Sequence, residues 1–539
     1  MKIDLIYSGN SLYTPKWQLG KVICFESDVF LLKNSLAGYL LTTESEYFIY
    51  VNSEYFEIPS EENILKIVTN FPGEIWHAGL KCNYAGLPKI LDYIEPNWIY
   101  SLDAPASVAS SSWKISIDCF LAKTAILKKC KLFEPIFETK TGCSIDWGYS
   151  LYKKGVILRY EPTLTHFLGG SNYQEISKSD ELRFVLRNFS RKWYYWSLYR
   201  LVRNSYGIKK TLLSFYKTYS TKPNELIYVQ RQISIPTVAN NSFKISVFTP
   251  TLQRYSYLEE ELKQLREQTI KPFEIFITDQ TDKSLREISW LANYEDLPIV
   301  YQGQDEKGQC NAWNFCLENA KGEYVLFLGD DADEIQPNFI ESLLNTLIYY
   351  KADMVACNIK ERENDYPFKQ SDVFTTDTFP ICLVKRSVFK KTGGYDYAYN
   401  KGIRADGDLA IRMHLAGSLM LLNPEIKIHH HRAPIGGLRA HGQRTVTRSM
   451  SKKNTSTFHL PSFSEIYLGK RYFSLDQEKE SNAIRTLSML SIDGGLLKKI
   501  SKVVIFIFKS KIIRKELLEI ESKAINLFNE YPQIPKIKN

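Results

Sequence analysis

Several carboxylates follow the end of one strongly apolar segment of the chain. The stretch YVLFLGDDADEIQP at 324–337 places Asp330, Asp331 and Asp333 directly after a short apolar run. Adjacent carboxylates repel one another, so such a cluster at the end of a buried strand needs a positive partner. A helix N-cap explains one aspartate but not three, and a calcium loop would distribute its ligands over about twelve residues around a central glycine. The spacing Asp-Ala-Asp suits Mg²⁺ or Mn²⁺ that carries a nucleotide diphosphate, because these ions combine one or two protein carboxylates with phosphate oxygens and water.

The region around these carboxylates alternates apolar runs with helical patterns. The apolar runs read as buried strands at 244–250, 274–279, 298–301 and 324–328, and helical patterns cover 257–268 and 310–320. This alternation predicts a mostly parallel sheet in an α/β domain. Because open sheets bind ligands at the carboxyl ends of their strands, we expect Thr251, Asp279 and the three aspartates to share one edge.

The N-terminal half repeats two segments of this region. ESEYFIYVNSEYFEIP at 44–59 parallels GEYVLFLGDDADEIQP at 322–337, and IDWGYSLYKKGVILRYEPTLTHF at 145–167 parallels GDLAIRMHLAGSLMLLNPEIKIHHH at 407–431. In both members of the second pair, a glycine follows the aspartate after nine residues and a proline follows it after sixteen. Matching spacings in a matching order predict an internal duplication.

These patterns divide the chain of 539 residues into four parts. We expect a degenerate α/β domain at 1–220 and a polar, proline-containing linker at 221–242. A second α/β domain at 243–455 carries the chemistry, and a helical extension follows at 456–539.

Composition excludes several classes of protein. The net charge of +9 is a mild excess and no nucleic-acid reader motif is present, so nucleic-acid binding is not indicated. The nine cysteines form no CxxC pair, which argues against a disulfide framework or a structural zinc site and favours a reducing compartment. The first residues lack the pattern of a signal peptide, and no apolar run reaches the ~20 residues that span a bilayer. We therefore expect a cytoplasmic protein.

Two basic, aromatic stretches leave a choice open. Residues 191–217 and 496–515 read as amphipathic helices, and the second carries seven Lys or Arg residues and no acid around an apolar VVIFIF core. Such a helix suits peripheral contact with the anionic inner face of a cell membrane, where a lipid-linked acceptor would be found. The alternative is a helix packed on the α/β domain with its lysines in water.

Five ordered motifs resemble those of glycosyltransferase family 2. They are KISVFTPTLQR (244–254), EIFITDQTDKS (274–284), GQCNAWNFCLENAKGEYVLFLGDDAD (308–333), GGYDYAYNKGIRADGDLAIRMHLAG (393–417) and NPEIKIHHHRAP (423–434). The resemblance covers residues 243–448. It implies the nucleotide-sugar-binding GT-A fold and the transfer of a sugar, with inversion, from a nucleotide-diphosphate donor to a saccharide or lipid-linked acceptor. It also implies a role in bacterial surface-polysaccharide synthesis.

The resemblance assigns donor and metal contacts to the residues at the strand ends. It implies that Thr251 and Asp279 help to hold the nucleotide base. Asp331 and Asp333, with Asp330 adjacent, are implied to contact the ribose and the Mn²⁺ or Mg²⁺ ion on the diphosphate. Of these, we expect Asp331 and Asp333 to be the pair that binds the metal.

Three further positions follow from the later motifs. Asp406 matches the aspartate of the family's Glu-Asp motif, which is proposed as the base that deprotonates the acceptor hydroxyl, and a positioned carboxylate can accept that proton. His430 is implied to reach the metal or the diphosphate. Arg439 belongs to the Gly-rich basic loop 432–444, which suits closure over a diphosphate or is a solvated surface loop.

Some positions depart from the family pattern. Gly329 stands where many relatives have an aspartate, and Ala405 replaces the Glu of Glu-Asp. Trp313 replaces an arginine that often precedes the asparagine at 314, so a phosphate contact is missing or is supplied elsewhere. By residue type alone, Asp406 also suits the N-cap of the following helix, and Asp408 suits a structural pair with an arginine one turn later.

The N-terminal copy lacks the acidic groups. Asn52-Ser53-Glu54 stands at the place of the aspartate cluster, and Cys143-Ser144 stands at the place of Glu-Asp. We therefore expect this half to fold like a transferase without binding a nucleotide sugar productively.

Two rival functions remain at this stage. One is a non-catalytic carbohydrate-binding or scaffold protein built from two such folds, against which the joint presence of Asp331, Asp333 and Asp406 argues. The other is a nucleotidyltransferase, which would have a loop rich in glycine and basic residues after the first strand. TPTLQRYSY has no glycine there.

Overall fold

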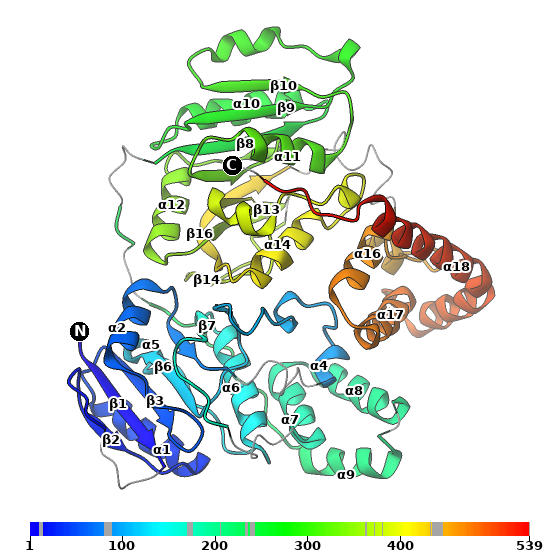
Figure 1. Cartoon of the computed structure of the whole chain (residues 1–539). Coiled ribbons are helices and arrows are strands. Elements are labelled where there is room, and N and C mark those ends of the chain that lie inside the picture. The colour runs from blue at the N-terminus through cyan, green and yellow to red at the C-terminus, as the bar shows by residue number, and fades with distance from the viewer. Residues whose placement is uncertain are drawn as a thin grey trace.

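The structure is a computed structural model that places two α/β domains one above the other, with a group of helices beside them (Figure 1). It describes residues 1–537 except 10–14, 80–88, 170–175, 205, 232–234, 238–242, 362–363, 371, 380, 432 and 434–445.

The C-terminal domain is built on a nine-stranded sheet with the order β10-β9-β8-β11-β15-β13-β16-β12, in which β14 also pairs with β16. The strands are β8 (Ile245–Thr251), β9 (Glu274–Asp279), β10 (Ile299–Gly303), β11 (Tyr324–Phe327), β12 (Ala332–Asp333), β13 (Met354–Glu361), β14 (Phe374–Thr375), β15 (Cys382–Lys385) and β16 (Met420–His430). The neighbours from β10 to β11 run parallel, β15 is antiparallel to β11 and β13, and β13 and β16 are parallel. The expected α/β architecture is confirmed.

Helices cover both faces of this sheet. They are α10 (Tyr255–Arg266), α11 (Gln309–Asn319), α12 (Phe339–Tyr349), α13 (Phe389–Thr392) and α14 (Ala405–Leu415). Successive side chains of a strand point to opposite faces. Val247 of β8 accordingly belongs to the buried cluster that holds Leu258 of α10. Phe248 belongs to the cluster that holds Cys316 of α11.

The N-terminal domain repeats this topology with a seven-stranded sheet of order β2-β1-β3-β6-β4-β7-β5. Its strands are β1 (Ile3–Ser8), β2 (Val22–Cys24), β3 (Tyr47–Asn52), β4 (Ile75–His77), β5 (Ser110–Ser111), β6 (Cys119–Lys123) and β7 (Leu158–Tyr160). Taken in sheet order from β2 to β5, these strands correspond to β9, β8, β11, β15, β13, β16 and β14 of the larger sheet. Every pair of neighbouring strands runs in the same relative direction as its counterpart. The predicted duplication is confirmed, and among the described residues only β10 and β12 lack a counterpart.

The remaining helices pack around the N-terminal sheet or form the C-terminal extension. The former are α1 (Val29–Thr42), α2 (Glu61–Asn70), α4 (Lys89–Asp92), α5 (Thr124–Leu127), α6 (Lys140–Lys153), α7 (Lys178–Asn188), α8 (Arg191–Arg203) and α9 (Ile208–Thr218). After the second sheet come α15 (Arg448–Lys453), α16 (Phe463–Tyr472), α17 (Leu475–Leu490) and α18 (Leu496–Glu530). In the part of the chain that the structure describes, no helix is both long and apolar enough to cross a bilayer.

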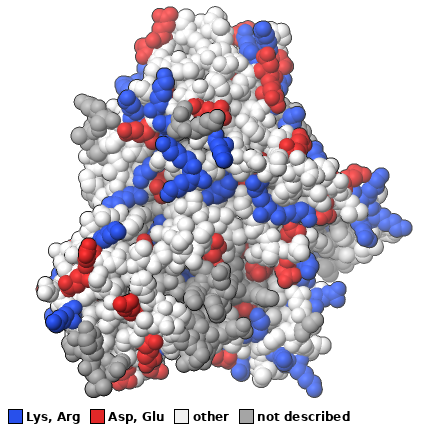
Figure 2. All heavy atoms as spheres, viewed as in Figure 1, with Lys and Arg blue, Asp and Glu red and all other residues white. Residues whose placement is uncertain are grey.

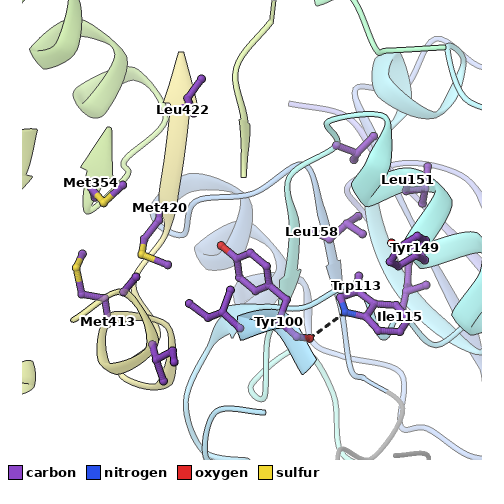
Figure 3. Close-up of a cluster of buried hydrophobic side chains, with 14 of the residues drawn as sticks. Tyr100, Trp113, Ile115, Tyr149, Leu151, Leu158, Met354, Met413, Met420 and Leu422 are labelled. Atoms are coloured by element: carbon purple, nitrogen blue, oxygen red, sulfur yellow. Dashed lines mark hydrogen bonds between the residues drawn. The ribbon is translucent and has the colours of Figure 1, made fainter. Parts of the chain in front are cut away.

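The two domains share one buried cluster. Figure 3 shows Tyr100 and Trp113 of the N-terminal domain on one side, facing Met413 and Met420 of the C-terminal domain. The indole of Trp113 donates to the backbone oxygen of Tyr100 at 2.9 Å. The hydroxyl of Tyr100 in turn donates across the interface to the backbone oxygen of Thr376.

The segment expected to be a polar linker contains a buried arginine that joins the domains. The side chain of Arg231 forms a two-point ion pair with Glu74 at 2.6 and 2.7 Å. It also donates to the backbone oxygens of Gly155, in the N-terminal domain, and Val373, in the C-terminal domain. Both charged side chains are almost fully buried, so this part of the linker is a fixed element of the interface.

We predict that Arg231→Ala lowers the free energy of unfolding by about 3 kcal/mol or more, because it leaves the Glu74 carboxylate buried without its partner. Urea denaturation followed by circular dichroism measures the change. Lys131→Ala is the matched control, since it breaks the exposed Lys131–Glu225 pair, which water screens and which should contribute little to stability. Equal effects of the two substitutions would contradict the interfacial role of Arg231.

Candidate functional site

The predicted edge of the sheet brings most of the candidate residues together. Thr251 ends β8 and Asp279 ends β9, while Asp330 and Asp331 lie between β11 and β12. The short strand β12 carries Asp333 and pairs with the end of β16, where the three histidines lie. The carboxyl ends of neighbouring strands therefore form one acidic edge that histidines border.

An arginine lies between the first two aspartates. The Nη1 atom of Arg254, which follows β8, is 2.7 Å from Oδ1 of Asp330 and 3.2 Å from Oδ2 of Asp331. Burial raises the pKa of Asp330 above its usual range and the negative charge of Asp331 adds to this, although Arg254 and Thr251 act in the opposite direction. Sequence reasoning missed Arg254, although its place directly after a strand end was visible.

His430 contacts the second aspartate of the cluster. Its Nε2 atom lies 2.9 Å from Oδ1 of Asp331, and the backbone N–H of Ala433 donates to Oδ2 at 2.9 Å. Burial alone would raise the pKa of Asp331, but His430, Arg254 and this N–H group together hold it below its usual range. Asp331 is thus a buried carboxylate whose charged form is stabilised by several hydrogen-bond donors.

Asp333 lies in a separate, more exposed group. Its Oδ1 accepts from the side chain of Gln264 at 2.6 Å, and its Oδ2 is 2.9 Å from Nε2 of His431. Asp333, His429 and His431 each offer one ligand atom, and these atoms lie within 4.8 Å of one another. The structure therefore divides the predicted metal set of Asp331, Asp333 and His430 between two neighbouring groups.

Asp279 is fully buried and bound by two tyrosines. The hydroxyls of Tyr255 and Tyr301 donate to its Oδ2 at 2.6 and 2.8 Å, and the backbone N–H of Thr281 donates to its Oδ1 at 2.8 Å. These bonds fix the end of β9 and the neighbouring tyrosine rings. The predicted loop residue Arg439 lies outside the described residues.

Asp406 lies exposed on the first turn of α14. It borders a cavity of about 220 Å³ whose walls include Trp313 and Tyr395. Their rings stack with centroids 6.1 Å apart. Trp313, which stands at the place of the family's arginine, thus forms an aromatic wall for this cavity.

Asp408 has the structural role that its spacing indicated. Its Oδ2 accepts from Nε and Nη2 of Arg412 at 2.9 and 2.7 Å, and its Oδ1 accepts from the hydroxyl of Tyr472 at 2.7 Å. The predicted pair is confirmed. Because Asp408 is fully buried, Asp406 is the acid of this turn that lies at the surface.

The corresponding edge of the N-terminal domain has a different chemistry. Asn52 is buried at the end of β3, and its side chain donates to Oδ1 of Asp118 at 3.0 Å. Asp146 is paired with Arg187 at 2.8 Å, as Asp408 is with its arginine. The buried aspartate–arginine pair that supports the helix is therefore present in both domains. At the strand end, however, the N-terminal domain has an amide where the second domain has carboxylates.

The second domain is similar to known proteins. Residues 246–412 match the model of the family described as Glycosyl transferase family 2. The chain is 31% identical over 134 residues to the glycosyltransferase GlyA of Streptococcus pneumoniae, which covers 24% of this chain and 18% of that protein. It is 32% identical over 104 residues to a Campylobacter jejuni GalNAc(5)-diNAcBac-PP-undecaprenol beta-1,3-glucosyltransferase, covering 19% of this chain and 33% of that protein.

Solved structures give weaker likenesses. Staphylococcus aureus TarS residues 1–349, in complex with UDP-GlcNAc, align at 15% identity with a TM-score of 0.34, covering 53% of this chain and 80% of that chain. A mannosyltransferase from Pyrobaculum calidifontis, in complex with GDP-Man and Mn²⁺, aligns at 15% identity with a TM-score of 0.31, covering 54% and 88%. The chain spans about a fifth of the length of GlyA and of two glycosyltransferases of Rickettsia species that it also matches.

We predict that amide substitutions at the two acids of α14 destabilise the protein to very different extents. Asp408→Asn should lower the free energy of unfolding by about 3 kcal/mol, because it leaves the guanidinium of Arg412 buried without a counter-charge. Asp406→Asn should cost less than about 1 kcal/mol, the contribution of one exposed acid at a helix N-terminus. Urea denaturation of both variants tests the assignment, and a large loss at Asp406 would show that its role is structural.

Proposed function

We propose that this chain, whose residues 246–412 belong to glycosyl transferase family 2, is a metal-dependent, inverting glycosyltransferase. Its donor is a nucleotide-diphosphate sugar, and its acceptor is a hydroxyl group of a saccharide or a lipid-linked saccharide. The observation that carries the proposal is that one domain holds an acidic edge, with Asp330, Asp331 and Asp333, and an exposed acid, Asp406, that borders a cavity.

The acidic edge has the donor atoms that a divalent cation needs. Carboxylate oxygens and imidazole nitrogens, from Asp331, Asp333 and the histidines of β16, fit Mn²⁺, and the carboxylates alone fit Mg²⁺. Such an ion supplies positive charge against the departing diphosphate. Thr251 and Asp279, at the ends of the adjacent strands, lie where the base and ribose of the donor would bind.

The residues around the aspartates shape the donor site before the donor binds. Arg254 offers a cation that can move from the carboxylates to a phosphate, since guanidinium binds both groups. Tyr255 and Tyr301 hold the carboxylate of Asp279 and place aromatic rings beside it. Arg439 of the basic loop completes the donor contacts in this proposal.

Asp406 is the proposed base. A sugar hydroxyl is a weak nucleophile, so a carboxylate that accepts its proton during attack lowers the barrier. Asp406 is exposed to an acceptor at the cavity, and the aromatic wall formed by Trp313 and Tyr395 offers a flat apolar surface against which a sugar ring can pack. An inverting transfer needs the base on the face of the donor sugar opposite the diphosphate, and the proposal gives that position to Asp406.

The name of the Campylobacter relative supports a lipid-linked acceptor. That protein acts on a polyprenyl-diphosphate-linked saccharide, according to its description. We extend this class of acceptor to the present chain, and with it a place in cell-surface polysaccharide synthesis on the inner face of the cell membrane. The N-terminal domain, with its amide at the strand end, is proposed to be non-catalytic.

We predict that, when Mn²⁺ or Mg²⁺ is present, the protein hydrolyses at least one UDP- or GDP-sugar or transfers the sugar from it to an acceptor. Asp406→Asn should lower kcat by about 10²- to 10⁴-fold, the usual contribution of a general base. Asp333→Ala should remove the stimulation by metal. Release of nucleoside diphosphate measures both.

Glu54→Gln is the matched control for this experiment. It removes an exposed acid from the corresponding edge of the N-terminal domain and should leave turnover unchanged. Metal-independent turnover, or full activity of both Asp406→Asn and Asp333→Ala, would contradict the proposed mechanism. Sugar binding without turnover of any donor would favour the rival carbohydrate-binding function.

A helix of the C-terminal extension supports a membrane location. Lys502 of α18 is buried and donates to the backbone oxygens of Asn454 and Thr457, so the helix is anchored to the domain. The other six basic residues between 496 and 515 are exposed, and Figure 2 shows basic side chains at the tip where α18 lies. The helix also exposes large apolar side chains, namely Leu496, Leu497, Ile500, Val503, Val504, Ile507, Phe508, Ile512, Leu518 and Ile525.

Of the two expectations for this stretch, the exposed apolar side chains favour the membrane surface over a packed helix. An anionic bilayer would neutralise the lysines and take up the apolar groups. We therefore propose that α18 binds the inner face of the membrane peripherally and brings the acidic edge near a lipid-linked acceptor.

We predict that the protein floats with vesicles of phosphatidylglycerol and phosphatidylcholine, and that Leu497→Glu with Phe508→Glu abolishes flotation. These side chains are 83% and 82% exposed, so their replacement leaves the core intact. Leu41→Glu, at an 85% exposed position of α1, is the control. Substitution is preferable to deletion of 496–539, which would remove the buried Ala524 and Leu527. Equal flotation of the double variant would exclude α18 as the membrane contact.

A further inference from the structure

We infer that helices α8 and α9 of the N-terminal domain form a contact with an anionic membrane surface. This contact is distinct from the one proposed for α18, because it depends on the residues of these two helices alone. It gives a domain that lacks the acidic edge a task of its own.

The helix α9 has its apolar side turned outward. Toward the protein it buries the small hydroxyl residues Thr211, Ser214 and Thr218. Its large apolar side chains are more than half exposed, namely Ile208, Leu212, Leu213 and Tyr216. A helix at the surface of a soluble protein normally has the reverse arrangement, with its apolar side against the core. The outer side of α9 therefore suits an apolar environment outside the protein.

Hydrogen bonds hold α9 in this orientation. The hydroxyl oxygens of Thr218 and of Tyr194 in α8 lie 2.7 Å apart, and both side chains are buried. The hydroxyl of Thr218 also donates to the backbone oxygen of Ser214 at 2.7 Å, and that of Thr211 donates to the backbone oxygen of Gly207 at 2.9 Å. A rotation of α9 that buried its apolar side would break the bond to α8.

The outer side of α8 has a similar composition. Tyr195, Tyr199 and Val202 follow one another at about one turn of the helix, and all three are exposed. Tyrosine is enriched where a bilayer meets water, since its ring is apolar and its hydroxyl is polar. The two helices have 13 and 11 residues, about 20 Å or less, so they suit the plane of the surface and are too short to cross a bilayer.

The charge of the segment favours an anionic bilayer over other partners. Residues 189–224 include eight Lys or Arg and no Asp or Glu. Arg200 and Lys217 form ion pairs with Glu480 and Glu138. The other six are exposed, namely Arg191, Lys192, Arg203, Lys209, Lys210 and Lys222.

These charges disfavour a second copy of the chain as the occupant. A symmetric dimer through this face would bring the two sets of basic side chains together, and like charges repel. Anionic headgroups would neutralise the basic side chains, and the hydrocarbon directly below the headgroups would take up the apolar ones.

The attachment of α8 places this contact beside the C-terminal extension. The Nε and Nη2 atoms of Arg200 donate to the two carboxylate oxygens of Glu480 in α17, each at 2.7 Å. The next helix after α17 is α18, and Figure 1 shows α8, α17 and α18 at the same end of the molecule. Two weak contacts on one protein reinforce each other, because the second forms at a high local concentration. Loss of either contact should therefore release the protein from the membrane.

The test is cosedimentation of the full chain with vesicles of phosphatidylglycerol and phosphatidylcholine. We expect Leu212→Gln with Tyr216→Gln to lower the partition coefficient by about 10-fold or more, since it keeps the net charge and removes apolar groups that enter the bilayer. Phe30→Gln with Leu41→Gln is the matched control. It makes the same kind of change at two exposed positions of α1 and should leave binding unchanged. Circular dichroism checks that each variant folds.

Two results of this experiment would overturn the inference. One is binding of the α9 variant at the wild-type level, and the other is an equal loss of binding in the α1 control. A wild-type dimer in the absence of vesicles that the α9 substitutions dissociate would also overturn it, because a second copy would then cover this face.

A second arm replaces the vesicles with dextran sulfate, a soluble anionic polymer. The polymer would contact the lysines without taking up the apolar groups, so the α9 variant should bind it as the wild type does. Lys209→Gln with Lys210→Gln should weaken binding to the vesicles by about 10-fold or more. A loss of polymer binding in the α9 variant as large as its loss of vesicle binding would count against a bilayer.

The outcome is separable from that of the proposed function. The α9 substitutions lie outside the acidic edge and the cavity of Asp406, so release of nucleoside diphosphate from a soluble donor should be unchanged. Vesicle binding that depends on α9 in a protein without turnover would support this contact and count against the activity. Turnover with vesicle binding that is independent of α9 would overturn the contact and leave the glycosyltransferase proposal standing.

Discussion

The acidic edge depends on the charge pairing of Asp330 and Asp331 with Arg254 and His430. Two adjacent buried carboxylates raise each other's pKa, and burial raises it further. Arg254 contacts both side chains, and His430 contacts the second, so the pair can be retained at the end of a buried strand. Each of these two partners comes from a different element, Arg254 from the turn after β8 and His430 from β16. The edge therefore requires the sheet order that brings these strands together.

The duplicated domain shows what remains when that charge balance is lost. Its sheet retains the same strand order and directions, and its α6 retains a buried aspartate paired with an arginine. At the strand end, the side chain and the backbone N–H of Asn52 both donate to Asp118, in place of an aspartate pair. A neutral amide needs no buried cation, which is consistent with a frame kept for packing after its ligand chemistry has gone.

The sequence predicted the parts of the site that depend on local pattern. Apolar runs placed the strands, and the i, i+4 spacing of Asp408 and Arg412 predicted their ion pair, because helix geometry brings such residues together. The partners of the histidines could not be predicted in this way. A shift of one residue in the register of β12 against β16 would exchange His430 for its neighbours, and register depends on long-range packing. Arg231 was assigned to a linker for the same reason, since its partner Glu74 is far away in the sequence.

The support of Asp406 joins the two domains into one functional unit. At the N-terminal end of α14, Asp408 accepts from Tyr472 of α16, so the extension fixes the first turn. At the C-terminal end, the ring of His414 is bonded to the backbone oxygen of Leu102, and Arg159 donates to the backbone oxygen of Gly417 at 2.9 Å. Both of those partners belong to the N-terminal domain. The proposed base would need to be held within a fraction of an ångström of its working position. The N-terminal domain and the extension hold opposite ends of the helix that carries Asp406, which gives both parts a reason to be retained around the second domain if the proposal holds.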